Sequence, residues 1–121
     1  MKENPRNLIG LTKQFALGII RLYSRLPKSG EAQVLGKQVL RSGTSVGAHY
    51  REAQRAKSNP DFINKIQGTL QELDETIYWL ELLDESGICQ DEQATTLRHE
   101  ADELMAILTT IVKTVKSRKA P

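Results

Sequence analysis

The chain has 121 residues, of which 39% are hydrophobic and 26% are charged. This length allows one domain with a single core, and the composition is that of a soluble globular protein. No apolar run is long enough to span a bilayer, and the first residues lack the apolar segment of a secretory signal. The single cysteine, Cys89, has no partner for an internal disulfide. We therefore expect one domain over residues 1–121, located in the cytoplasm and not in a membrane.

The formal net charge of +2 conceals two halves of opposite sign. Residues 1–60 contain eleven Lys and Arg against three acids, which gives a net charge of +8. Residues 61–121 contain six basic and twelve acidic side chains, which gives a net charge of −6. Charge that is separated along a chain bears on its partners rather than on its fold. We expect this separation to serve either nucleic acid or a complementary protein surface.

Helical periodicity and turn signals predict four helices, over residues 5–26, 31–57, 60–86 and 91–117. Pro27 ends the first segment, Pro60 follows a Ser-Asn cap at the start of the third, and Gly87 follows the end of the third. No segment alternates like a strand. Because the connections are short, the predicted fold class is all-α, an antiparallel up-down-up-down four-helix bundle.

The second helix carries a face of small residues beside its core positions. A glycine inside a helix costs roughly 1 kcal/mol relative to alanine, so glycines four residues apart indicate that another backbone comes close. The members of this face that we assign to a subunit interface are Gly36, Gly43, Gly47 and Tyr50.

The third helix carries large apolar side chains opposite its predicted core seam, which runs from Ile66 to Leu80. Tyr78, Trp79 and Leu82 would face solvent there, and a contiguous patch of this kind usually marks an association surface. We assign these three residues to the oligomer interface as well. The alternative is a rotated third helix that buries them in the core.

A third face of the second helix is basic. Lys37, Arg41, Arg51 and Arg55 form one stripe, and Lys57 lies just beyond it. The stripe is about 27 Å long at the helical rise of 1.5 Å per residue, which matches several phosphate spacings of a nucleic-acid strand. These five residues are the predicted nucleic-acid-binding site. The alternative is a solvated charged face without a partner.

The same segment offers no catalytic group. A hydroxyl inside a helix, such as that of Ser42 or Ser45, can bond to the carbonyl one turn back and is then no nucleophile. His49 falls on the core seam, where we expect a hydrogen-bonded core residue. No Glu stands three residues before His99, so the Glu-x-x-His pattern of di-iron bundles is missing. We expect no enzyme activity, no metal and no cofactor.

One enzymatic alternative remains. All-α nucleotide pyrophosphatases hold magnesium with paired acidic motifs, and two such pairs occur in the chain: Glu72 with Glu75, and Glu100 with Glu103. The predicted seams turn Glu72 and Glu75 away from the fourth helix. We therefore expect the four carboxylates not to converge.

Several segments carry a family resemblance: residues 38–42, 45–48, 51–53, 72–76 and 78–83. With them, nearly the whole chain resembles the bacterial four-helix-bundle family named for the 23S rRNA intervening-sequence protein. The resemblance implies a cytoplasmic, non-enzymatic bundle that assembles into a ring-like homopentamer. Related accessory proteins of diversity-generating retroelements are pentamers that bind nucleic acid and a reverse transcriptase. His49 stands where the family pattern usually has Asn.

The residues and the resemblance together favour a homo-oligomeric scaffold, expected to be a pentamer, that binds RNA or DNA backbone through its basic second helix. A closed ring needs two different surfaces on each subunit, and the oppositely charged halves supply such a pair. The alternatives are an adaptor for a partner protein, with no nucleic-acid role, and the metal-dependent pyrophosphatase.

Overall fold

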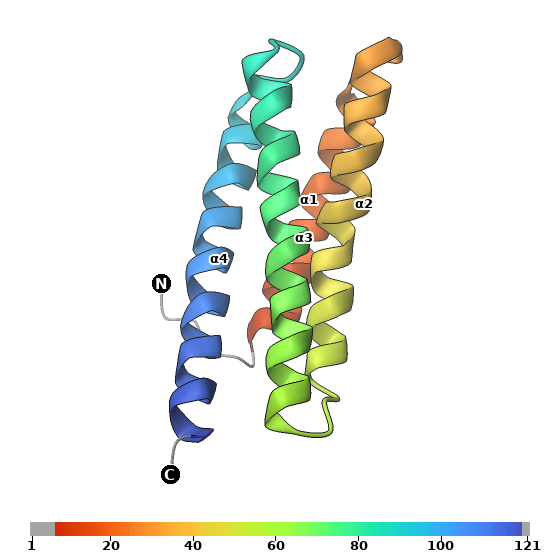
Figure 1. The fold of residues 1–121 in the computed structure, drawn as a ribbon. Helices are drawn as coiled ribbons and strands as arrows, with labels where there is room; N and C mark the ends of the chain where they lie inside the picture. The colour runs from red at the N-terminus through yellow and green to blue at the C-terminus, as the bar shows by residue number, and fades with distance from the viewer. Residues whose placement is uncertain (1–6, 120–121) are drawn as a thin grey trace.

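The computed structural model describes residues 7–119, and these residues form four helices without a strand. The helices are α1 (Leu8–Arg25), α2 (Gly30–Ala53), α3 (Asn59–Glu85) and α4 (Glu92–Lys119). They run antiparallel to their chain neighbours, with the α1–α2 and α3–α4 connections at one end of the bundle (Figure 1). This arrangement confirms the all-α four-helix bundle. The first residues of the predicted helix 5–26 lie outside the described part of the chain.

Local sequence signals set most helix ends. Leu26 is extended because it precedes Pro27, and α1 therefore ends at Arg25. The Ser58 side chain accepts a hydrogen bond of 3.2 Å from the Asp61 N–H and caps α3. Asp91 does the same for α4, since its Oδ1 lies 2.9 Å from the Ala94 nitrogen.

The second helix is shorter than its sequence pattern predicts. It ends at Ala53 rather than near residue 57. Arg55 N–H donates to the Glu52 carbonyl and Ala56 N–H to the Ala53 carbonyl, so the chain tightens into a turn before α3 begins. Two residues of the predicted nucleic-acid-binding site, Arg55 of the stripe and Lys57 just beyond it, consequently follow the helix instead of lying on it.

Core residues recur at helical spacing in α1, from Leu8 to Leu22, and in α4, from Ala94 to Val112. The third helix is rotated from its predicted seam, because Thr69 and Thr76 are fully buried while Leu70 and Ile77 are only partly buried. Thr76 Oγ1 donates to Ser42 Oγ of α2 at 2.9 Å. Thr76 Oγ1 also lies 2.8 Å from the Glu72 carbonyl one turn back, and Thr69 Oγ1 lies 3.1 Å from that of Lys65, so α3 itself offers each buried hydroxyl a partner.

The helices do not contact each other equally. Helices α2 and α3 share the largest contact, and α1 with α4 share the smallest. No helix among the described residues combines the length and the apolar character that a membrane crossing requires.

Candidate functional site

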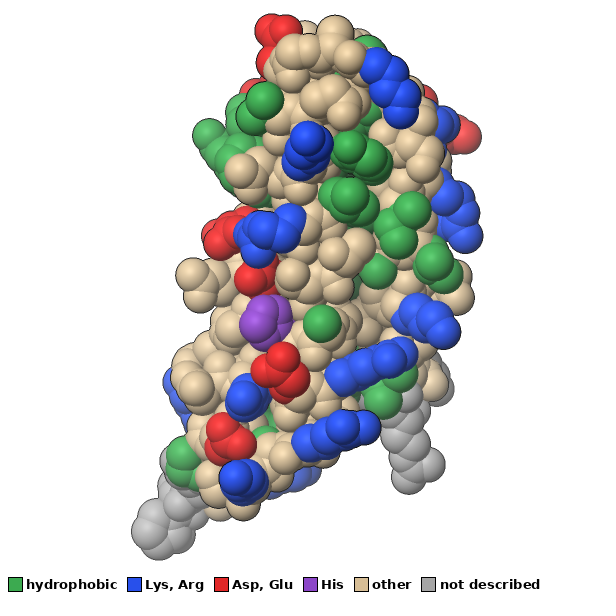
Figure 2. All heavy atoms as spheres, turned by 90° about the vertical axis from the view of Figure 1, so that its right-hand side faces the viewer, with side chains coloured by type: hydrophobic (Ala, Val, Ile, Leu, Met, Phe, Trp, Pro, Cys, Tyr) green, Lys and Arg blue, Asp and Glu red, His purple; other side chains and the backbone are tan. Residues whose placement is uncertain are grey.

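The predicted basic residues are all exposed on the α2 side of the molecule. Lys37, Arg41 and Arg51 lie on α2, and Arg55 and Lys57 lie in the turn that follows it. Figure 2 shows Lys and Arg side chains spread over the face formed by α1 and α2, with hydrophobic side chains between them. The structure therefore leaves all five predicted side chains accessible to a partner.

Arg41 differs from the other four because it is tied to α3. Its Nη2 lies 2.7 Å from Glu75 Oε1 and 3.4 Å from Glu72 Oε1. Glu72 Oε1 is buried and accepts no hydrogen bond from the described residues, so Arg41 supplies its nearest positive charge. Arg41, Glu72 and Glu75 form an α2–α3 ion cluster, and His49 Nε2 lies 3.5 Å from Glu72 Oε2 at its edge. A large share of the Arg41 charge is thus compensated within the chain.

The remaining four cations are differently placed. Within the described part of the chain, the side chains of Lys37, Arg51, Arg55 and Lys57 form no ion pair. Each positive charge is solvated and open to a phosphate or carboxylate of a partner.

A groove of about 490 Å³ lies between α1 and α2 beside Arg51. Small residues such as Ala16, Gly47 and Ala48 line it, and Lys13 of α1 adds a second cation. Sequence reasoning missed Lys13. The sequence could have pointed to Lys13, because it lies in the stretch between Arg6 and Lys28, which contains no acid.

The glycines of α2 serve a contact within the chain. A Cβ at Gly43 would meet Ile19 Cγ1 at 2.8 Å, and a Cβ at Gly36 would meet Leu26 Cδ1 at the same distance. The prediction that Gly36, Gly43 and Tyr50 face another subunit is therefore wrong, because α1 covers both glycines and Tyr50 is fully buried.

Gly47 and the predicted apolar patch of α3, Tyr78, Trp79 and Leu82, are at least partly exposed. Gly47 is partly exposed in the α1–α2 groove. Tyr78 is 53% exposed, whereas Trp79 is partly buried and packs against the core, with the two ring centroids 5.1 Å apart. Leu82 is also partly buried. For these four residues, a role in an oligomer interface stays a prediction.

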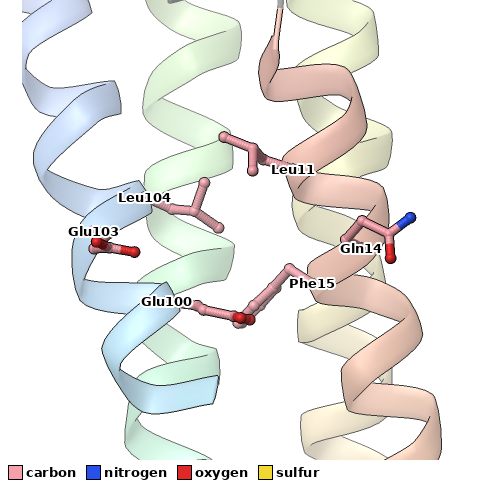
Figure 3. A pocket seen from close by; sticks show the side chains of 6 residues that line it. All are labelled: Leu11, Gln14, Phe15, Glu100, Glu103 and Leu104. Atoms are coloured by element: carbon pink, nitrogen blue, oxygen red, sulfur yellow. The ribbon is translucent and has the colours of Figure 1, made fainter. Parts of the chain in front are cut away.

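The acidic pairs do not converge. Glu72 and Glu75 face Arg41 of α2, whereas Glu100 and Glu103 of α4 line a small pocket against Leu11, Gln14 and Phe15 of α1 (Figure 3). No three or more His, Cys, Asp or Glu side chains among residues 7–118 are placed to hold a metal ion. This geometry argues against the pyrophosphatase alternative.

The pocket between α1 and α4 has a volume of about 120 Å³ and a partly apolar lining. Burial in this setting raises the pKa of the Glu100 carboxyl above its ordinary value, and the neighbouring charge of Glu103 adds to the effect. The pocket is smaller than the roughly 300–1,000 Å³ of typical small-molecule sites.

The serines and His49 show no catalytic arrangement. Ser45 Oγ donates to the Arg41 carbonyl one turn back at 2.7 Å, as expected for a helical serine. Ser42 instead accepts the hydrogen bond from Thr76. His49 lies at the edge of the bundle beside Glu72, with 36% of its side chain exposed, rather than in the core.

The model of one protein family, the 23S rRNA-intervening sequence protein, matches residues 8–110. The chain belongs to this family. A crystal structure of a protein of unknown function from the S23 ribosomal protein family of Bacteroides thetaiotaomicron is 41% identical to this family member, with a TM-score of 0.81. The match covers 87% of this chain and 97% of the other. None of the curated proteins compared with the chain matches it.

Proposed function

We propose that this family member is a non-enzymatic, homo-oligomeric scaffold of the cytoplasm that binds the phosphate backbone of RNA or DNA. The observation that carries the proposal is the set of exposed cations without an ion pair among the described residues, Lys37 and Arg51 on α2 and Arg55 and Lys57 in the turn that follows it. Their charge attracts a polyanion without reading its sequence. The family's name refers to 23S rRNA, which agrees with an RNA partner.

The oligomer is part of the same proposal. Tyr78, Val34, Ile20 and Ile9 are large apolar side chains that are 40–64% exposed. Such residues gain burial when copies associate, and the separated charges favour a contact between unlike surfaces. A ring of five copies is the assembly we propose.

A titration of mixed-sequence RNA and DNA against the purified protein at several salt concentrations tests nucleic-acid binding. We expect affinity to fall steeply with salt, because each phosphate contact releases counterions. Absence of binding at low salt, or binding that salt leaves unchanged, would contradict the proposal. Light scattering with and without nuclease treatment reports the number of copies, and a monomer would contradict the scaffold.

The adaptor alternative assigns the same cations to a protein contact. The α1–α2 groove favours it, since small residues beside Lys13 and Arg51 would admit an acidic helix. Under this alternative, Lys37→Glu or Arg55→Glu dissociates the oligomer or releases a protein partner. Under nucleic-acid binding, the oligomer persists and only the affinity for RNA falls. Mass measurement on these variants separates the two functions.

A further inference from the structure

One end of the bundle gathers cations from three helices. It is the end where α2 connects to α3 and where α4 terminates (Figure 1). We call it the basic end. Among the described residues, its cations on α2, α3, α4 and the α2–α3 turn are Arg51, Arg55, Lys57, Lys65, Lys113, Lys116 and Arg118, and Lys13 of α1 lies beside Arg51. Only two acids, Glu52 and Asp61, accompany them.

The opposite end of the bundle is different in both number and pairing of charges. Arg25 Nη2 lies 2.7 Å from Asp91 Oδ2, and Arg98 Nη1 lies 3.0 Å from Asp84 Oδ2. Acids outnumber cations there. At the basic end, the one ion pair among the described residues joins Lys65 and Glu52 at 3.6 Å. Most of the positive charge at the basic end is therefore uncompensated.

The last turns of α4 are packed so that their cations point outward. Val112 is buried and Val115 is partly buried against the core, whereas Lys113, Lys116 and Arg118 are exposed. These residues follow the turn cations Arg55 and Lys57 by more than fifty positions in sequence, and the antiparallel topology brings both groups to the same end.

We propose that nucleic acid binds across the basic end and that Lys113, Lys116 and Arg118 of α4 are part of the phosphate-binding surface. This inference rests on the proposed function and relocates its site from the side of α2 to the end of the bundle. Cations from separate helices are spread over a surface rather than along one line. They can therefore contact more phosphates of a curved backbone than a single row can. Lys37, which lies in the other half of α2, contributes less.

The test compares two double variants that remove the same charge. Lys113→Ala with Lys116→Ala changes the basic end, and Arg21→Ala with Lys28→Ala removes two exposed cations from the opposite end. Binding of a fluorescent mixed-sequence RNA is titrated by anisotropy over a range of salt. We expect the first variant to lower the slope of log affinity against log salt by about two, one for each lost phosphate contact, and the second to leave it unchanged.

Three outcomes separate this inference from the proposed function. If Arg51→Ala lowers the slope and the Lys113/Lys116 variant does not, the inference is wrong and the proposed function stands. If the wild-type protein binds no RNA, both are wrong. If the Lys113/Lys116 variant changes the mass of the oligomer and leaves RNA binding intact, the basic end binds another copy and the inference is overturned.

Discussion

Individual residues fix the distances between helices in this bundle. Gly43 lets α1 approach α2 so closely that Ile19 occupies the space of the absent side chain. Asp91 caps α4 and at the same time binds Arg25 of α1, so a single carboxylate holds two helices at one end. Adding one methyl group at Gly43 or removing the carboxylate of Asp91 would disturb these contacts.

The close approach at Gly43 predicts opposite effects of the same substitution at two glycines. Gly43→Ala forces a methyl group against the fully buried Ile19, and we expect a loss of about 1–3 kcal/mol of unfolding free energy. Gly10→Ala meets nothing within 4 Å, and we expect a gain of up to about 1 kcal/mol from helix propensity. Chemical denaturation measures both. Equal stability of the two variants would contradict the tight α1–α2 contact.

Asp91 predicts a pH-dependent contribution to stability. The Ala94 N–H and then the Arg25 guanidinium lower the pKa of this carboxyl below its ordinary value. Its stabilisation is therefore present above the unfolded-state pKa and is lost as pH falls through the lowered folded-state pKa. We expect Asp91→Ala to cost about 1 kcal/mol at neutral pH and progressively less on acidification.

Asp91→Asn is the control, because an amide oxygen can still cap α4 but carries no charge. We expect its stability at neutral pH to lie between those of wild type and Asp91→Ala. An Asp91→Ala deficit that stays constant down to strongly acidic pH would show that the carboxylate charge is irrelevant.

At the scale of helices, α2 has two functions on different faces. One face packs on α1 and α3 through glycines and hydroxyls, and the other carries the cations. The α2–α3 ion cluster lies at the border between these faces. A cation of the stripe can therefore act either in holding α3 or in binding a partner.

This border position predicts distinct results for two arginines of the same helix. Arg41→Ala removes the nearest positive charge of the largely buried Glu72, and we expect a loss of about 1 kcal/mol in stability with little effect on RNA affinity. Arg51→Ala should leave stability unchanged and weaken RNA binding. Thermal unfolding and anisotropy on both variants provide the measurement. Equal weakening of RNA binding would show that the ion cluster opens for the nucleic acid.

The sequence predicts where each helix begins and ends better than it predicts which surfaces pack against that helix. Pro27 and Ser58 act on their own turn of backbone, so the helix ends they set are readable without the fold. Gly36 and Gly43 indicate that another helix approaches closely, but the sequence does not show whether that helix belongs to the same chain. The burial of Thr76 also escapes a hydrophobic pattern, because a hydroxyl that bonds to the carbonyl one turn back can lie in the core, and Ser42 of α2 adds a second partner.

At the scale of the whole molecule, the charge separation seen along the sequence is rearranged by the fold. The last part of α4 is basic, although it belongs to the acidic half of the sequence. Antiparallel packing places it at the same end of the bundle as the turn after α2, and a basic end results. The copies of a cyclic oligomer are related by rotation about one axis, so all of them point the same way along it. Copies whose helices run along this axis would present all their basic ends on the same face of the ring.

The small contact between α1 and α4 has a consequence for how the bundle opens. The amide protons of a helix exchange with solvent when its packing is lost locally, and segments with few neighbours open at the lowest free-energy cost. Helix α4 is held chiefly by α3, while α2 is enclosed by two well-packed helices. Deuterium should therefore enter the C-terminal turns of α4 long before the middle of α2. These turns carry Lys113 and Lys116, so this segment can adjust its position most readily when a ligand binds.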